Sequence, residues 1–180
     1  MTPHSFRAYK SAIRIFGLAP FFVALMAVML TVSSPVSAGT EAPETRLREF
    51  NLEKGVAIQG YDPVAYFTRN QAVKGDPEIS HTHKGVTYYF ASAGHRSKFQ
   101  ETPKKFEPAY GGWCAYAMGE NGSKVRIDPE TFKITDGRLY LFYNFYLINT
   151  KTKWEQDQER LKERADQLWK LHLSGQEIPE

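Results

Sequence analysis

The distribution of apolar and polar residues sets the first 38 residues apart from the rest of the chain. A basic start is followed by an apolar run, Leu18–Leu30, and by the small residues Val36-Ser37-Ala38. This three-part pattern is typical of a cleavable secretory signal peptide over residues 1–38. The run is shorter than the about 20 residues that span a membrane comfortably. We therefore expect a periplasmic protein that meets the membrane only through this segment. An uncleaved N-terminal anchor is the alternative.

After the signal peptide, short apolar segments separated by turn residues predict a domain that mixes strands and helices. Residues 39–54 are polar and we expect a loose lead-in, followed by a domain over residues 55–145. Lys84-Gly85 and Asp136-Gly137 each separate two strand-like segments and predict hairpins, because these residues tolerate a positive φ. Ser92 is a candidate N-cap for a helix that extends to about Glu101.

The C-terminal segment has a helical period. Apolar residues recur at three- and four-residue steps between about Phe145 and Leu173, which predicts one long helix. This helix forms most of a segment, residues 146–180, that packs on the domain or extends from it. Together the elements predict an α+β fold with two hairpins and a long C-terminal helix.

The charge balance excludes one class of function. The chain of 180 residues has 23 Lys and Arg against 20 Asp and Glu. Three of these cations and none of the acidic residues lie in residues 1–38, so the rest of the chain carries equal numbers of each sign. A neutral domain lacks the basic surface that must neutralise several phosphates. We therefore expect no nucleic-acid partner.

Cys114 is the only cysteine, which excludes an internal disulfide and any multi-cysteine metal site. If a helix begins after Gly111-Gly112-Trp113, the thiol lies in its first turn, where the helix dipole stabilises a thiolate. Met118 follows four residues later and can share the same helix face. A thiolate and a thioether form a soft ligand pair suited to Cu(I). The alternative is that both are core residues on an apolar face.

Three histidines are further candidate metal ligands. His81 and His83 are two apart on a predicted strand, so both side chains point to one face and could clamp copper or zinc. Solvated histidines at a hairpin edge are the alternative. His95 lies in the first turn of the helix after Ser92, where the dipole disfavours the imidazolium and leaves a neutral ring free to ligate. A surface or capping histidine is its alternative.

Four motifs occur in a fixed order: "GYDPVAYF", "HKGVTYYFASAGHRSKF", "YGGWCAYA" and "DGRLYLFYN". Together they resemble the secreted YHS-domain-containing (seleno)protein family over residues 55–145. The resemblance implies a treble-clef-like hairpin–helix core and an association with metal handling. The metal-type YHS pattern has cysteine at the positions of Ala65 and His95, so the usual finger ligands are missing here. Cys114 matches a position that is selenocysteine in some members, which implies redox or soft-metal chemistry.

These observations leave three functions open. The first is a periplasmic protein that binds a soft metal, with copper as the leading candidate, through Cys114. Met118 and His95 would be co-ligands, and His81 and His83 would be entry ligands that the metal meets first. The second is a thiol-redox protein in which Cys114 reacts with peroxide, a small thiol or a partner thiol. Of the three functions, only this one would make the protein an enzyme. The third is a non-catalytic interaction domain that recognises a partner through an aromatic surface, with a structural Cys114.

Overall fold

The computed structural model describes residues 42–179 of the chain. The chain divides into two units, Met1–Ser37 and Ala38–Glu180, and all described residues belong to the second. The predicted signal peptide lies outside the described residues. Within the described part of the chain, no helix combines the length and the apolar character needed to cross a bilayer.

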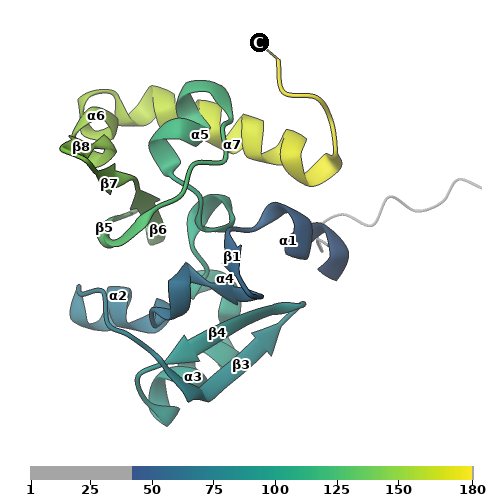
Figure 1. The fold of residues 1–180 in the computed structure, drawn as a ribbon, viewed down its shortest axis with the longest axis vertical. Helices are drawn as coiled ribbons and strands as arrows, with labels where there is room; N and C mark the ends of the chain where they lie inside the picture. The colour runs from purple at the N-terminus through teal and green to yellow at the C-terminus, as the bar shows by residue number, and fades with distance from the viewer. Residues whose placement is uncertain (1–41, 180) are drawn as a thin grey trace, which may run out of the picture. The chain divides into compact units, whose positions relative to one another are not determined.

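The first half of the described chain forms a four-stranded sheet with short helices (Figure 1). The strand order is β1-β2-β4-β3, with β2 and β4 parallel and the other neighbours antiparallel. The elements are α1 (Pro43–Glu49), β1 (Leu52–Glu53), β2 (Val56–Ala57), η1 (Ile58–Gly60), α2 (Pro63–Arg69), β3 (Asp76–His83), β4 (Val86–Phe90), α3 (Ala93–Glu101) and α4 (Pro103–Phe106).

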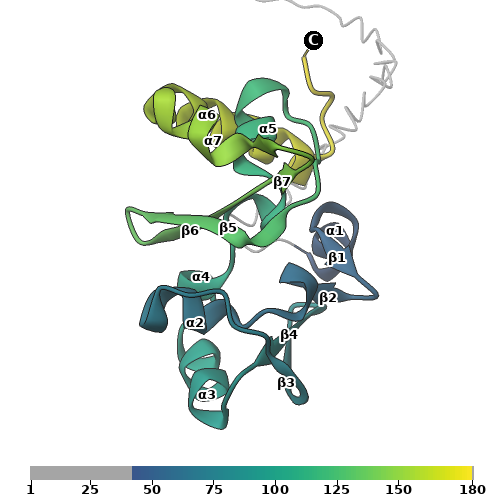
Figure 2. The ribbon, with the colours of Figure 1, turned by 60° about the vertical axis from the view of Figure 1, so that its left-hand side comes forward.

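The second half contains two further hairpins and the longer helices (Figure 2). Strands β5 and β6 pair antiparallel, as do the two-residue strands β7 and β8. The elements are η2 (Ala109–Gly112), α5 (Ala115–Asn121), β5 (Asp128–Thr135), β6 (Arg138–Phe142), β7 (Asn144–Phe145), β8 (Ile148–Asn149), α6 (Thr150–Gln156) and α7 (Gln158–Ser174).

One apolar core joins the two halves. It includes Tyr88 and Phe99 from the first half and Cys114, Tyr140 and Trp154 from the second, all at most 1% exposed. Strand β6 lies at its centre, with Leu139, Tyr140, Leu141 and Phe142 all buried. This agrees with the apolar residues on both faces of that segment in the sequence.

The α+β fold class is confirmed, as are several of its predicted elements. Both predicted hairpins form, at Lys84-Gly85 and at Asp136-Gly137. The Ser92 hydroxyl accepts a hydrogen bond from the His95 N–H and begins α3, which ends at Glu101.

Two predictions about the ends of the domain are wrong. The lead-in predicted over residues 39–54 contains the helix α1 and the strand β1, and α1 buries Arg46 and Glu49. The long C-terminal helix does not begin near Phe145, because residues 144–149 form the β7–β8 hairpin and two helices follow it. The apolar run at this hairpin fits a helical period, but its side chains are not part of a buried helix face.

Candidate functional site

The residues that the sequence singles out do not converge on one site. Cys114 and Met118 belong to α5 and its N-cap, which pack against α6, α7 and β6. His95 belongs to α3, which packs against α2, α4, β3 and β4. The ribbons of α3 and α5 lie at opposite ends of the domain in both views (Figures 1 and 2). Within residues 42–179 no group of three His, Cys, Asp or Glu side chains is arranged to hold a metal ion.

Cys114 is completely buried and closes a ring of hydrogen bonds. Its Sγ lies 3.4 Å from the donating Tyr143 N–H and 3.3 Å from Thr150 Oγ1. The Thr150 hydroxyl donates to the Tyr143 carbonyl at 3.0 Å, so the thiol hydrogen can complete the ring by bonding Thr150 Oγ1. Every polar group of the ring is then satisfied with Cys114 as a neutral thiol. Cys114 thus ties the start of α5 to the two residues that flank the β7–β8 hairpin.

The helix geometry around Cys114 differs from the sequence prediction. Cys114 is the N-cap of α5 and not a residue of its first turn, and its side chain forms no capping hydrogen bond. Met118 N–H donates to the Cys114 carbonyl, which puts the two residues one helical turn apart, and both side chains are fully buried. The pair therefore belongs to the apolar core, which was the alternative to a soft-metal site.

Both ring nitrogens of His95 have polar neighbours in this structure, and its role as a metal ligand stays a prediction. Its Nδ1 lies 2.6 Å from Asp62 Oδ2, and its Nε2 lies 3.4 Å from Thr68 Oγ1. Asp62 is completely buried, and its carboxylate also accepts hydrogen bonds from the N–H groups of Val64, Ala65 and Ala91. The pair links the first turn of α2, the end of β4 and α3. In this position the pair acts as a structural cross-link between these three segments.

His81 and His83 share one face of β3, as their spacing predicts, and no third His, Cys, Asp or Glu of the described residues completes a metal-ligand group with them. Both rings contact the Phe99 ring edge-on, with centroids 6.2 Å apart. Gln100 Nε2 lies 3.3 Å from His81 Nδ1. Burial lowers the pKa of the His83 imidazole, so the ring is neutral over a wider pH range. The two histidines cover Phe99 at the edge strand of the sheet.

A cavity of about 250 Å³ lies beside α1, α4 and α7, with Phe50, Tyr110 and Trp169 among its lining residues. Arg46 and Arg138 also line it, but Glu107 and Asp166 neutralise them through ion pairs. Lys104 and Lys105 are exposed at its border. The cavity therefore offers no buried unpaired charge that would select an anionic ligand.

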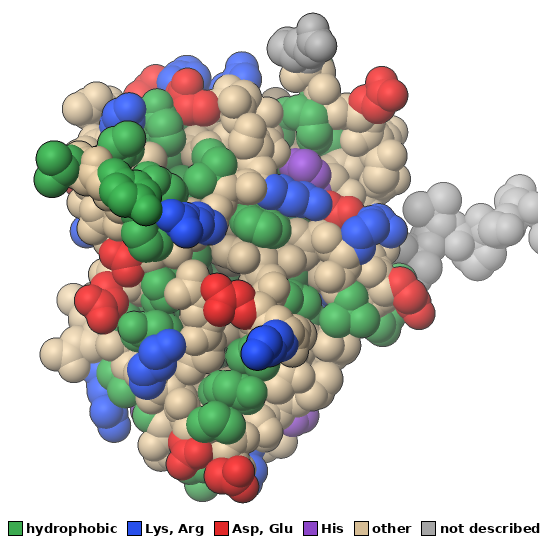
Figure 3. Space-filling view, viewed as in Figure 1, with side chains coloured by type: hydrophobic (Ala, Val, Ile, Leu, Met, Phe, Trp, Pro, Cys, Tyr) green, Lys and Arg blue, Asp and Glu red, His purple; other side chains and the backbone are tan. Residues whose placement is uncertain are grey.

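The most unusual feature of the described surface is the tip of the β7–β8 hairpin, which the sequence analysis missed. Tyr146 is 83% exposed, Leu147 is fully exposed and Ile148 is 49% exposed. They are three of the four large exposed hydrophobic residues in the described part of the chain, with Leu47 on α1 as the fourth. Figure 3 shows hydrophobic side chains gathered at the corner where β7 and β8 lie. Contiguous exposed apolar groups of this kind mark interaction sites.

The backbone of this tip is as unusual as its side chains. Four two-residue hairpin turns occur among residues 42–179, and in each both turn residues have a positive φ. Three of them place glycine second: Lys54-Gly55, Lys84-Gly85 and Asp136-Gly137. The fourth has Tyr146 at φ 51° and Leu147 at φ 66°. A residue with a Cβ in this conformation costs about 1–2 kcal/mol, so the chain holds two large apolar side chains at a strained position.

No family model, no curated protein and no solved structure matches this chain.

Proposed function

We propose that this protein is a secreted, non-catalytic interaction domain that binds its partner through the tip of the β7–β8 hairpin. The observation that carries the proposal is the Tyr146-Leu147 turn, where strain and exposure coincide. Strained residues persist where the surrounding structure over-determines them, and they concentrate at functional sites. A turn selected for stability alone would have glycine in second position, as the three other two-residue turns within residues 42–179 do.

The hairpin is held in place before it meets a partner. At its base, the Thr150 N–H and hydroxyl both donate to the Tyr143 carbonyl at 3.0 Å. On its flank, Asn144 Nδ2 donates to Thr131 Oγ1 at 2.9 Å. A tip held rigidly by its base loses less conformational entropy on binding. Cys114 takes part in this support through its contacts with Tyr143 and Thr150.

The YHS resemblance is compatible with this function and remains part of the proposal. In a YHS-like core without the usual finger ligands, the Asp62–His95 pair supplies a cross-link between the hairpin-bearing sheet and its helices. The domain then needs no metal in order to fold. Export by the predicted signal peptide would bring the hairpin to the periplasm.

A photoreactive residue at the tip tests the proposal. With the photoreactive amino acid at position 147, illumination of cells that export the chain should yield covalent adducts. The same amino acid at Leu47, which is 49% exposed on α1, is the matched control and should yield none. Excess wild-type chain should compete the adducts away, because it occupies the same partner. Equal labelling from positions 147 and 47, or none from either, would contradict the proposal.

Soft-metal binding is a second candidate function, favoured by one observation. Cys114 and Met118 lie one turn apart, and the Tyr143 N–H lies next to Sγ, where it can donate to a thiolate ligand. We then expect Cys114→Ser to bind Cu(I) at least about tenfold more weakly than wild type in competition with a chelator. Equal affinities would exclude this site. A thiol-redox function has no such support, since Sγ is buried and its hydrogen bonds are filled.

A further inference from the structure

Resting on the interaction function proposed above, we infer that the partner of the β7–β8 tip is a lipid surface with anionic headgroups. The tip would insert Tyr146, Leu147 and Ile148 among the headgroups and the first acyl carbons. Basic side chains beside the hairpin would contact the headgroup phosphates.

The size and form of the tip favour a lipid surface over a protein. A stable protein interface buries about 800 Å² on each partner. The exposed apolar area here is confined to one two-residue turn and the residue after it, and the other large exposed hydrophobic residue, Leu47, lies on a different element. A projecting turn of this size fits a deformable surface without needing a matched groove. Tyrosine beside aliphatic residues suits the boundary between headgroups and acyl chains.

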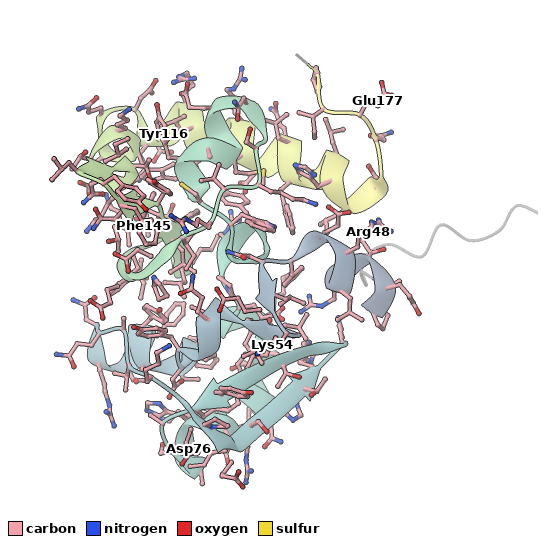
Figure 4. The ribbon with its side chains drawn as sticks, viewed as in Figure 1. Arg48, Lys54, Asp76, Tyr116, Phe145 and Glu177 are labelled. Atoms are coloured by element: carbon pink, nitrogen blue, oxygen red, sulfur yellow. The ribbon has the colours of Figure 1, made fainter. Side chains whose placement is uncertain are left out.

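The charges around the tip complement an anionic surface. The hairpin itself, residues 144–149, is uncharged. The Arg126 guanidinium lies 4.4 Å from the centre of the Phe145 ring, and Lys153 Nζ lies 5.7 Å from that of Tyr116. Figure 4 shows Phe145 and Tyr116 on the same side of the molecule. Lys151 follows the hairpin in the sequence, at the start of α6.

The acidic groups near the tip cancel these cations only in part. Arg126, Lys151 and Lys153 take part in no ion pair within residues 42–179. Glu155, on the same helix as the two lysines, is paired with Lys133 at 3.3 Å. Asp128 keeps its negative charge, since Thr131 and Asn144, which donate to it at 2.8 and 3.5 Å, are neutral. Arg126, Lys151 and Lys153 thus stand against the carboxylates of Asp128 and Glu130, the latter lining the same pocket as Lys151, which leaves an excess of one positive charge behind the tip.

Vesicle binding tests the inference with the chain that begins at Gly39, the form left by the predicted cleavage; residues 38–180 are a compact unit of their own. We expect this chain to sediment with vesicles that contain phosphatidylglycerol and to bind phosphatidylcholine vesicles more weakly. Raising the salt from about 50 mM to about 500 mM should weaken binding, since the cations contribute through screened attraction. A Tyr146→Trp variant should show a blue shift of its emission and quenching by brominated lipid.

The double variant Tyr146→Asn/Leu147→Gly separates binding from folding. Asn-Gly is the preferred sequence for this turn, so the variant should unfold at the same or a higher denaturant concentration than wild type. Its vesicle binding should fall by about tenfold or more, because two large apolar side chains are gone. Leu47→Asn, which removes the other exposed leucine, should bind vesicles like wild type.

The outcomes distinguish this inference from the function on which it rests. Wild-type chain that fails to bind anionic vesicles, or a double variant that binds them equally well, overturns the lipid partner. If tip adducts in cells then prove to be protein, the interaction function stands with a different partner. If vesicle binding and tip adducts are both absent, both proposals fall.

Discussion

Asp62→Ala should destabilise the domain by about 4 kcal/mol, one of the largest effects of any single substitution described here. The carboxylate is completely buried and serves four groups: the N–H groups of Val64, Ala65 and Ala91, and the His95 ring. Loss of the helix N-cap costs about 0.5–2 kcal/mol. Each buried donor left unpaired costs a further about 1–3 kcal/mol. Chemical denaturation followed by circular dichroism measures the sum.

Two variants show which part of the carboxylate carries the effect. Asp62→Asn keeps one oxygen for the cap of α2, but it turns an amide N–H toward the donating Ala91 N–H, so we expect about half the loss. Asp76→Ala is the matched control: Asp76 is exposed and accepts a local hydrogen bond from Glu78 N–H, and we expect about 0.5 kcal/mol. If Asp62→Ala is no worse than Asp76→Ala, the buried pair does not hold the three elements together.

The Asp62–His95 pair also shows which structural features a local sequence pattern can predict and which it cannot. Ser92 is a cap signal because it acts within one turn, and the sequence predicts this helix start correctly. Asp62, followed by Pro63, caps α2 by the same local geometry. The same Asp62 also bonds His95, a residue 33 positions away. Nothing in the local pattern distinguishes a histidine that will ligate a metal from one that will meet a buried carboxylate. Its role depends on how α2 and α3 pack.

The hairpins show the same limit in the backbone. The sequence predicts the turns at Lys84-Gly85 and Asp136-Gly137, because glycine adopts a positive φ at little cost and so marks such turns. Tyr146-Leu147 gives no such signal, and its neighbours continue an apolar pattern that fits a helix. Only the pairing of Asn144 with Asn149 and of Phe145 with Ile148 reveals the turn. The candidate site was missed because the residues that form it break the local rule for the structure they adopt.

Cys114 is the opposite case. Its sequence context suggests a reactive thiol, whereas the structure places that thiol in the core with its hydrogen bonds formed. A lone cysteine after two glycines and before a helix has the features of a reactive thiol. Its burial and its contacts with Tyr143 and Thr150 depend on β6 and α6, which come 24 or more residues later. The structure therefore moves the centre of the functional interpretation from the thiol to the hairpin that the thiol supports.

Gly119→Ala should destabilise the domain by about 3 kcal/mol, although alanine is the better helix former by about 1 kcal/mol. Gly119 lies in α5, where a Cβ would stand 2.5 Å from the Leu161 carbonyl oxygen and 3.1 Å from two further backbone atoms of Leu161. Backbone cannot rotate away as a side chain can, so α5 and α7 would have to separate. Arg164 Nε, which donates to the Gly119 carbonyl at 3.0 Å, would move with α7.

Gly94→Ala is the matched control, because Gly94 is an exposed residue of α3 whose added Cβ meets only Ser92 Oγ, at 3.8 Å. There the same substitution should stabilise the domain by about 0.5 kcal/mol through the lower entropy of the unfolded chain. The opposite signs follow from the neighbours alone, since both glycines lie in helices. Denaturant midpoints that move in the same direction in the two variants would rule out backbone contact between α5 and α7. That contact matters for the hairpin as well, because α5 begins at Cys114 and carries its sulfur to Tyr143 and Thr150.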